Sequence, residues 1–95
     1  MAIRWYRTED GQDYFTFDVV RLPNNTLRAY IDEQPSYGSR PSDGHSTHRY
    51  TETGTGRHYI CFEPVHPLCT EEQILRVMKQ WAEGTQHYIR TGVFK

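Results

Sequence analysis

Most of the residues that could perform chemistry in this chain gather in one stretch, "GHSTHRYTETGTGRHYICF", from Gly44 to Phe62. It contains three of the chain's 5 histidines and one of its 2 cysteines. Imidazole and thiol groups are common zinc ligands, and imidazole also serves as a general acid or base. The stretch therefore raises two hypotheses, a metal centre and a catalytic site, which the spacing of its residues has to support.

A zinc site would draw on five imidazole and thiol groups, those of His45, His48, Cys61, His66 and Cys69. Their spacing does not favour zinc, because the chain has no Cys-x-x-Cys pair. His45-x-x-His48 also runs into a predicted strand, where residues three apart point to opposite faces. Cysteines in such a chain are better explained as small apolar residues. We expect no metal and no other cofactor.

A cysteine nucleophile is a second hypothesis, since Cys69 directly precedes a predicted helix and His66 is close to it in sequence. A helix N-terminus favours the thiolate form of cysteine. Glu71 and Glu72 oppose a thiolate there, however, and no third group is evident to orient the imidazole. Cys69 is better explained as an apolar residue that packs against Ile74 at the helix start.

A small ribonuclease is a third hypothesis, with its acid, base and phosphate-binding groups taken from His48, His58, Arg49, Arg57 and Glu52. Strand alternation puts each of these histidines on the face opposite to its neighbouring arginine. The formal net charge of −1 is also unfavourable for an enzyme that gathers phosphates. Glu52 and Arg57 are more simply a cross-strand pair, so we expect a protein that is not an enzyme.

The elements that must position these residues follow from the periodicity of the chain. Segment 2–7 can form a short strand, and segments 13–22 and 26–33 alternate apolar and polar residues as half-buried strands do. The last two flank a Pro-Asn-Asn turn and predict a hairpin. The Pro-, Gly- and Ser-rich segment Gln34–Gly44 is then expected to be a loop.

Segments 46–52 and 57–63 flank Thr-Gly-Thr-Gly and predict a second hairpin. An even loop would place Tyr50 opposite Tyr59. A three-residue loop would place Tyr50 opposite Ile60 and would gather the apolar residues better. The sequence leaves both registers open.

The C-terminal helix is the clearest element, and we expect it over Thr70–Thr91. Thr70 and Gln73 have the spacing of a capping box, and Gly92 is a typical helix stop. One apolar stripe recurs at intervals of three and four residues along the segment: Ile74, Val77, Met78, Trp81, Thr85, Tyr88 and Ile89.

Together these elements predict an α+β fold. An antiparallel four- to five-stranded sheet, made of a β-meander plus a second hairpin, would be covered on one face by a single long C-terminal helix. The length of 95 residues predicts a single domain, residues 1–95. The expected core consists of Phe15, Phe17, Leu27, Ile31, Ile60, Ile74, Met78 and Trp81. The other face of the sheet would have no second layer within this chain.

Composition narrows the class of protein. The chain has 11 basic and 12 acidic residues without a basic block, which is untypical of a general nucleic-acid binder. No apolar run approaches the ~20 residues of a membrane span, and the first ten residues lack the apolar stretch of a signal peptide. Too few cysteines are present for a disulfide scaffold. We expect a cytoplasmic protein that does not enter the membrane.

The favoured function is binding to a protein partner through the uncovered sheet face and the Gln34–Gly44 loop. Aromatic and arginine side chains dominate protein-binding hot spots, and the expected anchors are Tyr30, Tyr37, Arg40, Arg49 and Tyr50. Tyr14 and Arg28 lie on the same predicted face. Small chains of this type are common among phages and mobile elements, where many act by occupying the surface of a host protein, including inhibitors of defence proteins.

Two alternatives use the same surface. Tyr30, Arg28, Tyr50 and Arg49 could stack on the bases of a nucleic acid. A bare sheet face or an edge strand could also pair with a second copy to form a homodimer.

Overall fold

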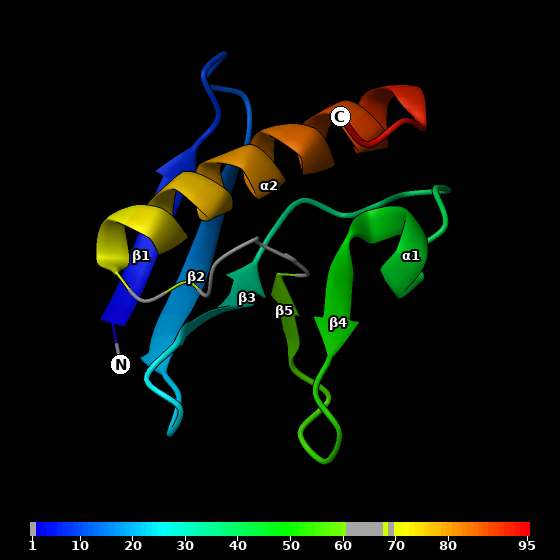
Figure 1. Cartoon of the computed structure of the whole chain (residues 1–95). Coiled ribbons are helices and arrows are strands. Elements are labelled where there is room, and N and C mark those ends of the chain that lie inside the picture. The colour runs from blue at the N-terminus through cyan, green and yellow to red at the C-terminus, as the bar shows by residue number, and fades with distance from the viewer. Residues whose placement is uncertain (1, 61–67, 69) are drawn as a thin grey trace.

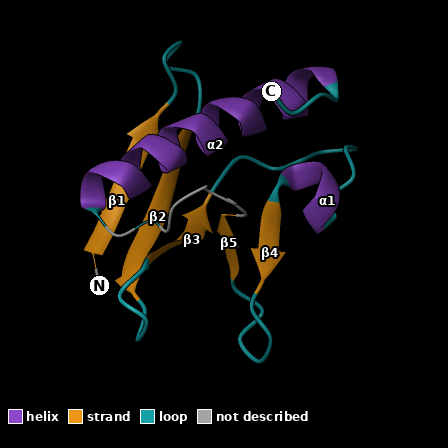
Figure 2. Ribbon diagram, in the orientation of Figure 1, coloured by secondary structure: helices purple, strands orange, loops and turns teal. Residues whose placement is uncertain are grey.

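The computed structural model describes residues 2–60, 68 and 70–95. In this part of the chain a five-stranded sheet has the order β1-β2-β3-β5-β4, and all neighbouring strands are antiparallel. The strands are β1 (Ala2–Arg7), β2 (Tyr14–Arg21), β3 (Leu27–Glu33), β4 (Arg49–Thr51) and β5 (His58–Ile60). The helices are α1 (Gly44–Thr47) and α2 (Glu71–Thr91), and α2 crosses one face of the sheet (Figures 1 and 2). The predicted fold class is confirmed.

Helix α2 begins and ends where its capping residues predict. The Thr70 hydroxyl accepts a hydrogen bond from the Gln73 main-chain N–H at 3.2 Å, and the Gln73 side chain accepts one from the Thr70 N–H at 3.1 Å. Gly92 ends the helix with a φ of 85°, a value that a residue without Cβ adopts freely. The predicted packing of Cys69 lies outside the described residues.

The core lies between α2 and the central strands and is rich in aromatic rings. Phe15 and Phe17 are completely buried, and Trp81 meets both rings edge-on at centroid distances of 5.9 and 6.1 Å. The residues predicted for the core belong to this buried cluster, except Leu27 and Ile31, which are partly buried and pack against it. Large rings thus compensate for the small number of aliphatic side chains.

The second hairpin has the even register. Tyr50 pairs with Tyr59, and the Glu52 N–H donates to the Arg57 carbonyl at 2.7 Å. The alternative that places Tyr50 opposite Ile60 is therefore wrong. Strand β5 also pairs with β3, so the hairpin adds to the meander with its second strand inside and β4 at the edge.

The predicted strand over residues 46–52 is wrong at its start, because Gly44–Thr47 forms the short helix α1. The Asp43 carboxylate caps it by accepting the Ser46 N–H at 3.0 Å. His48 ends it in the left-handed region with a φ of 53°, and only Arg49–Thr51 remains as strand. Asp followed three residues later by a free N–H is typical helix-capping chemistry, and here it outweighs strand alternation.

The two faces of the sheet differ sharply. Both helices lie on one side, where the Trp81 indole N–H donates to the main-chain carbonyl of Thr47 at the end of α1. We call the other side the open face; in the described part of the chain no helix lies on it. Alternation and register assign it the side chains of Ile3, Trp5, Arg7, Tyr14, Thr16, Asp18, Val20, Arg28, Tyr30, Asp32, Tyr50 and Tyr59.

Candidate functional site

One cross-strand row runs over the whole open face. The register places Ile3 of β1 beside Asp18, Asp18 beside Tyr30, Tyr30 beside Tyr59, and Tyr59 beside Tyr50 of β4. Directly opposed side chains on one face of an antiparallel sheet are close enough to interact. The row therefore joins both hairpins in one continuous surface.

The centre of this surface is a closed aromatic and ionic network. The Tyr30 ring is only 7% exposed, and its hydroxyl donates a short hydrogen bond to Glu52 Oε2. Arg28 donates to the same oxygen at 3.2 Å and lies 4.0 Å from the centroid of the Tyr59 ring. The hydrogen bonds from Tyr30 and Thr55 lower the pKa of Glu52, which therefore stays ionised.

Arg57 covers the centre of the network from the solvent side. Its guanidinium carbon lies 4.0 Å from the centroid of the Tyr30 ring, and Nη2 contacts Asp32 at 3.1 Å and Asp18 at 3.3 Å. Asp18 is buried and meets the cation with Oδ2, while its Oδ1 is buried without a hydrogen-bond partner. The side chains of Arg57 and Arg28 thus both face carboxylates within the molecule.

Large apolar side chains are exposed mainly at the β1 side of the open face. Trp5 is 75% exposed, Ile3 56% and Tyr14 47%, and we call these three residues the β1 patch. The Arg7 guanidinium lies over the Tyr14 ring at 5.9 Å from its centroid. Sequence reasoning missed Trp5 and Ile3, although their alternation with Arg4 and Tyr6 could have placed them on the same face.

The five predicted anchors form two separate groups. Tyr30 and Tyr50 lie on the open face and both contact the Tyr59 ring, at centroid distances of 6.0 and 5.5 Å. Tyr50 is 43% exposed, whereas the expected exposure of Tyr30 is not found. Arg49, which the sequence groups with them as a base-stacking residue, is paired across from Ile60 and points to the opposite side.

The other group fastens the loop between β3 and α1. Tyr37 lies against Tyr88 of α2 at a centroid distance of 6.0 Å, and the Arg49 guanidinium lies 4.9 Å from the Tyr37 ring centroid. Arg40 donates to the carbonyl oxygens of Ile89 and Arg90 at 3.2 and 3.1 Å, at the C-terminal end of α2. These contacts hold the loop against α2, on the side away from the open face.

The candidate ribonuclease residues do not converge. His58 pairs with Ile31 on the helix side of the sheet, where its Nδ1 lies 3.0 Å from the Thr51 hydroxyl. Burial, and then the nearby charge of Arg49, lower the pKa of His58. Glu52 and Arg57 lie on the open face, with the sheet between them and His58.

His48 lies apart from His58 and from the pair of Glu52 and Arg57. Its ring packs on Phe94 of the C-terminal tail at a centroid distance of 4.3 Å. Among the described residues no group of three or more His, Cys, Asp or Glu side chains could hold a metal ion. Cys61, His66 and Cys69, the other residues of the zinc and nucleophile hypotheses, lie outside the described part. None of the helices in that part is long and apolar enough to cross a membrane.

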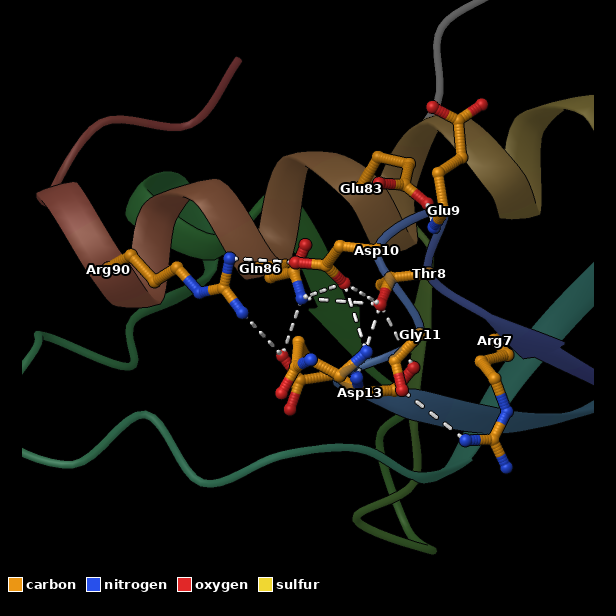
Figure 3. A network of polar contacts seen from close by, with 10 residues as sticks. Arg7, Thr8, Glu9, Asp10, Gly11, Asp13, Glu83, Gln86 and Arg90 are labelled. Atoms are coloured by element: carbon orange, nitrogen blue, oxygen red, sulfur yellow. Dashed lines mark hydrogen bonds and ion pairs between the residues drawn. The ribbon is translucent and has the colours of Figure 1, made fainter.

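A second polar cluster, which sequence reasoning also missed, ties the β1–β2 turn to α2 (Figure 3). The buried Gln86 amide donates to Asp13 Oδ2 at 2.7 Å, to Asp10 Oδ1 at 3.1 Å and to the Thr8 hydroxyl at 3.2 Å. Arg90 contacts the other oxygen of Asp10 at 2.9 Å. All of these groups satisfy one another, so the cluster is a fastening of the fold rather than a ligand site.

No protein-family model, no curated protein and no solved structure matches this chain. The functional argument therefore depends on the open face itself.

Proposed function

We propose that this protein is a non-enzymatic binding module that docks a protein partner on its open face and acts by occupying that partner's surface. The observation that carries this proposal is the 75% exposure of the Trp5 indole on a strand of a packed sheet, beside exposed Ile3 and Tyr14. Clustered exposed apolar groups mark interaction sites, and tryptophan and tyrosine are the commonest hot-spot residues.

The network at the centre of the open face supports the same proposal. This network joins β3, β5 and the turn between β4 and β5 through contacts among Tyr30, Tyr59, Arg28, Arg57 and Glu52, so the face presents its exposed side chains on a rigid platform. A rigid platform loses little conformational entropy when a partner binds. Exposed Tyr50 lies at the far end of the same row and extends the docking surface to β4.

A protein fits this surface better than a nucleic acid does. Arg28 and Arg57 already contact Glu52, Asp18 and Asp32, so phosphate groups would compete with carboxylates for both cations. Binding to nucleic acid gains most of its free energy from cations that are free to neutralise phosphates. The apolar β1 patch with polar residues beside it instead resembles the core and rim of a protein interface.

The test is affinity capture with the wild-type chain, followed by titration of the purified partner by calorimetry. Trp5→Ala and Tyr14→Ala should each weaken binding, with the loss at Trp5 reaching about 2 kcal/mol or roughly 30-fold in Kd. Val93→Ala is the matched control, because Val93 is 58% exposed but lies in the C-terminal tail. The Val93→Ala variant should bind the partner with the same affinity as the wild type.

Equal affinities for Trp5→Ala, Tyr14→Ala and the wild type would overturn the proposal. So would retention on nucleic acid that falls steeply with salt and is lost on substitution of Arg28 and Arg57. Circular dichroism of each variant confirms that the substitution has not unfolded the domain.

A further inference from the structure

Strand β1 is an edge strand, and its register with β2 fixes which main-chain groups point outward. The Thr8 N–H donates to the Asp13 carbonyl at 2.9 Å, which makes these two residues a hydrogen-bonded pair. Such pairs alternate with non-bonded ones along an antiparallel ladder. The even-numbered residues of β1 therefore bond to β2, whereas Ile3, Trp5 and Arg7 turn their N–H and C=O groups outward. In the described part of the chain no strand pairs with that side.

This edge has little of the protection that edge strands normally carry. β1 contains neither lysine nor proline, and its pairing with β2 runs without a bulge from Ala2 to Arg7. Its two charged side chains contact groups on the faces of the sheet, Arg4 at Glu71 and Arg7 at the Tyr14 ring. The residues with outward main-chain groups include Trp5 and Ile3, whose side chains are also the two most exposed of the β1 patch. Main-chain pairing and apolar contact are thus available along the same line.

Helix α2 adds an exposed apolar residue along this edge. Leu75 is 38% exposed and lies one helical turn from both Glu71 and Lys79. Glu71 forms an ion pair with Arg4 of β1, and Lys79 forms one with Glu9 just beyond it. Leu75 is therefore on the flank of α2 that lies over β1, so both layers of the fold expose apolar groups along one edge.

We propose that this edge pairs with β1 of a second copy, antiparallel and about a two-fold axis at Trp5, so that two sheets join into one. In this register Trp5 faces Trp5 of the second copy, and Ile3 faces its Arg7. Every outward main-chain group of the three residues then has a partner. Both copies keep their open faces on the same side, because the facing residues have the same parity.

Neighbouring registers are less favourable. Centring the axis on Arg4 would set the two Arg4 side chains directly opposite each other, and like charges in that position are destabilising. Centring it on Tyr6 would leave the main-chain groups of Ile3 without a partner. The Trp5 register instead places Arg4 opposite Tyr6 of the second copy. It requires only that Arg4 Nη1 release the Ile3 carbonyl, which it now contacts at 3.1 Å on the exposed edge.

A second copy is the occupant that this edge fits best, because the strand is complementary to itself in the register just described. Isologous pairing about a two-fold axis also closes the assembly at two chains. The dimer forms through the main-chain edge of β1, whereas the proposed docking of another protein uses the open face, and Trp5 and Ile3 take part in both. The dimer would place two β1 patches side by side.

The experiment is sedimentation equilibrium of the isolated protein with no partner present, comparing wild type, Ile3→Ala and Ile3→Pro. Both substitutions remove the same apolar side chain, but only proline also removes the outward N–H, a change that an edge strand tolerates. We expect the wild type to be a dimer. The dissociation constant of the dimer should be at least about tenfold higher for Ile3→Pro than for Ile3→Ala. Val93→Lys, at an exposed position of the C-terminal tail, should leave the dimer intact.

Amide hydrogen exchange of the wild type gives a second, variant-free readout. Protection at Ile3, Trp5 and Arg7 should rise with protein concentration, whereas Arg4 and Tyr6 should be protected at every concentration. A wild-type protein that stays monomeric up to millimolar concentration would overturn the proposal. Equal dissociation constants for the two Ile3 variants would do so too, as would an exchange rate of the Trp5 amide that does not change with protein concentration. None of these results would bear on docking of another protein.

Discussion

The guanidinium carbon of Arg57 lies 4.0 Å from the centroid of the Tyr30 ring, and this contact closes the centre of the open face. Arg57 comes from the turn of the second hairpin and Tyr30 from the middle of β3, so the contact also joins the two hairpins. It explains why Tyr30 is buried while Trp5, on the same face, is exposed.

Tyr30→Phe should therefore change stability and not partner binding. The substitution keeps the ring under Arg57 but removes the hydroxyl that donates to Glu52. We expect a lower urea midpoint and, by NMR titration, a Glu52 pKa that rises toward its usual value, since this hydrogen bond is the largest cause of its depression. Tyr14→Phe is the control, and equal effects of the two variants on the midpoint would contradict the assignment.

Trp81 should be the residue on which the core depends most. Its indole is 3% exposed, packs on Phe15 and Phe17, and donates to the carbonyls of Thr47 and His48 at 3.1 and 3.0 Å. Trp81→Ala should cost about 3–5 kcal/mol and can unfold so small a domain. Trp81→Phe keeps most ring contacts but leaves both carbonyls without the indole N–H as a donor. This loss should lower the free energy of unfolding in urea by about 1–3 kcal/mol. A Phe variant as stable as the wild type would show that these hydrogen bonds contribute nothing.

Gly84 should respond to substitution in a way that depends on the C-terminal tail. A Cβ at Gly84 would lie 2.6 Å from Phe94 Cε1 and 2.8 Å from the Lys95 carbonyl oxygen. Gly84→Ala should therefore displace the tail from the helix. The lost tail contacts should offset the gain in stability of about 1 kcal/mol that alanine normally brings to a helix. In a chain that ends at Val93 and so lacks both Phe94 and Lys95, the same change should stabilise the protein, so a double-mutant cycle of Gly84→Ala and the truncation measures the coupling. Additive effects would rule out this close packing.

Acid should weaken the fastening between the β1–β2 turn and α2. The Gln12 main-chain N–H, followed by the Thr8 hydroxyl and the Gln86 amide, holds the pKa of Asp10 well below its usual range. A depressed folded-state pKa gives stability that is present above the unfolded value of about 3.9 and is lost as pH falls below it.

The measurement for this prediction is the urea midpoint between pH 5 and pH 2 for the wild type, Asp10→Asn and Glu72→Gln. Asp10→Asn should flatten the decline, because its side chain no longer takes up a proton on unfolding. Glu72, which is exposed and forms an ion pair with Arg76 one turn away, serves as the control whose profile should follow the wild type. A profile of Asp10→Asn that also follows the wild type would contradict the role of Asp10.

The local elements of this protein could be read from its sequence, since their signals are local. The capping box at Thr70 and Gln73, the stripe that includes Trp81, and the alternation around Phe15 and Phe17 each depend on residues within a few positions of one another. Those signals predicted α2, the meander and the core. The one local error, the strand predicted where α1 lies, arose because the capping chemistry of Asp43 competes with strand alternation over the same few residues.

The character of the open face could be decided only by tertiary structure. Sequence alternation gives no reason for Trp5 and Tyr30 to differ in exposure. In the folded chain β5 pairs with β3 and brings Arg57 and Glu52 over Tyr30. Strand β1 lies at the edge of the sheet, so Trp5 remains in solvent. Likewise Arg40 and Tyr37 become supports of α2 because the chain folds back on the end of the helix. Pairing between segments far apart in sequence has no local signature, because its free energy comes from surfaces that meet only after the chain has folded.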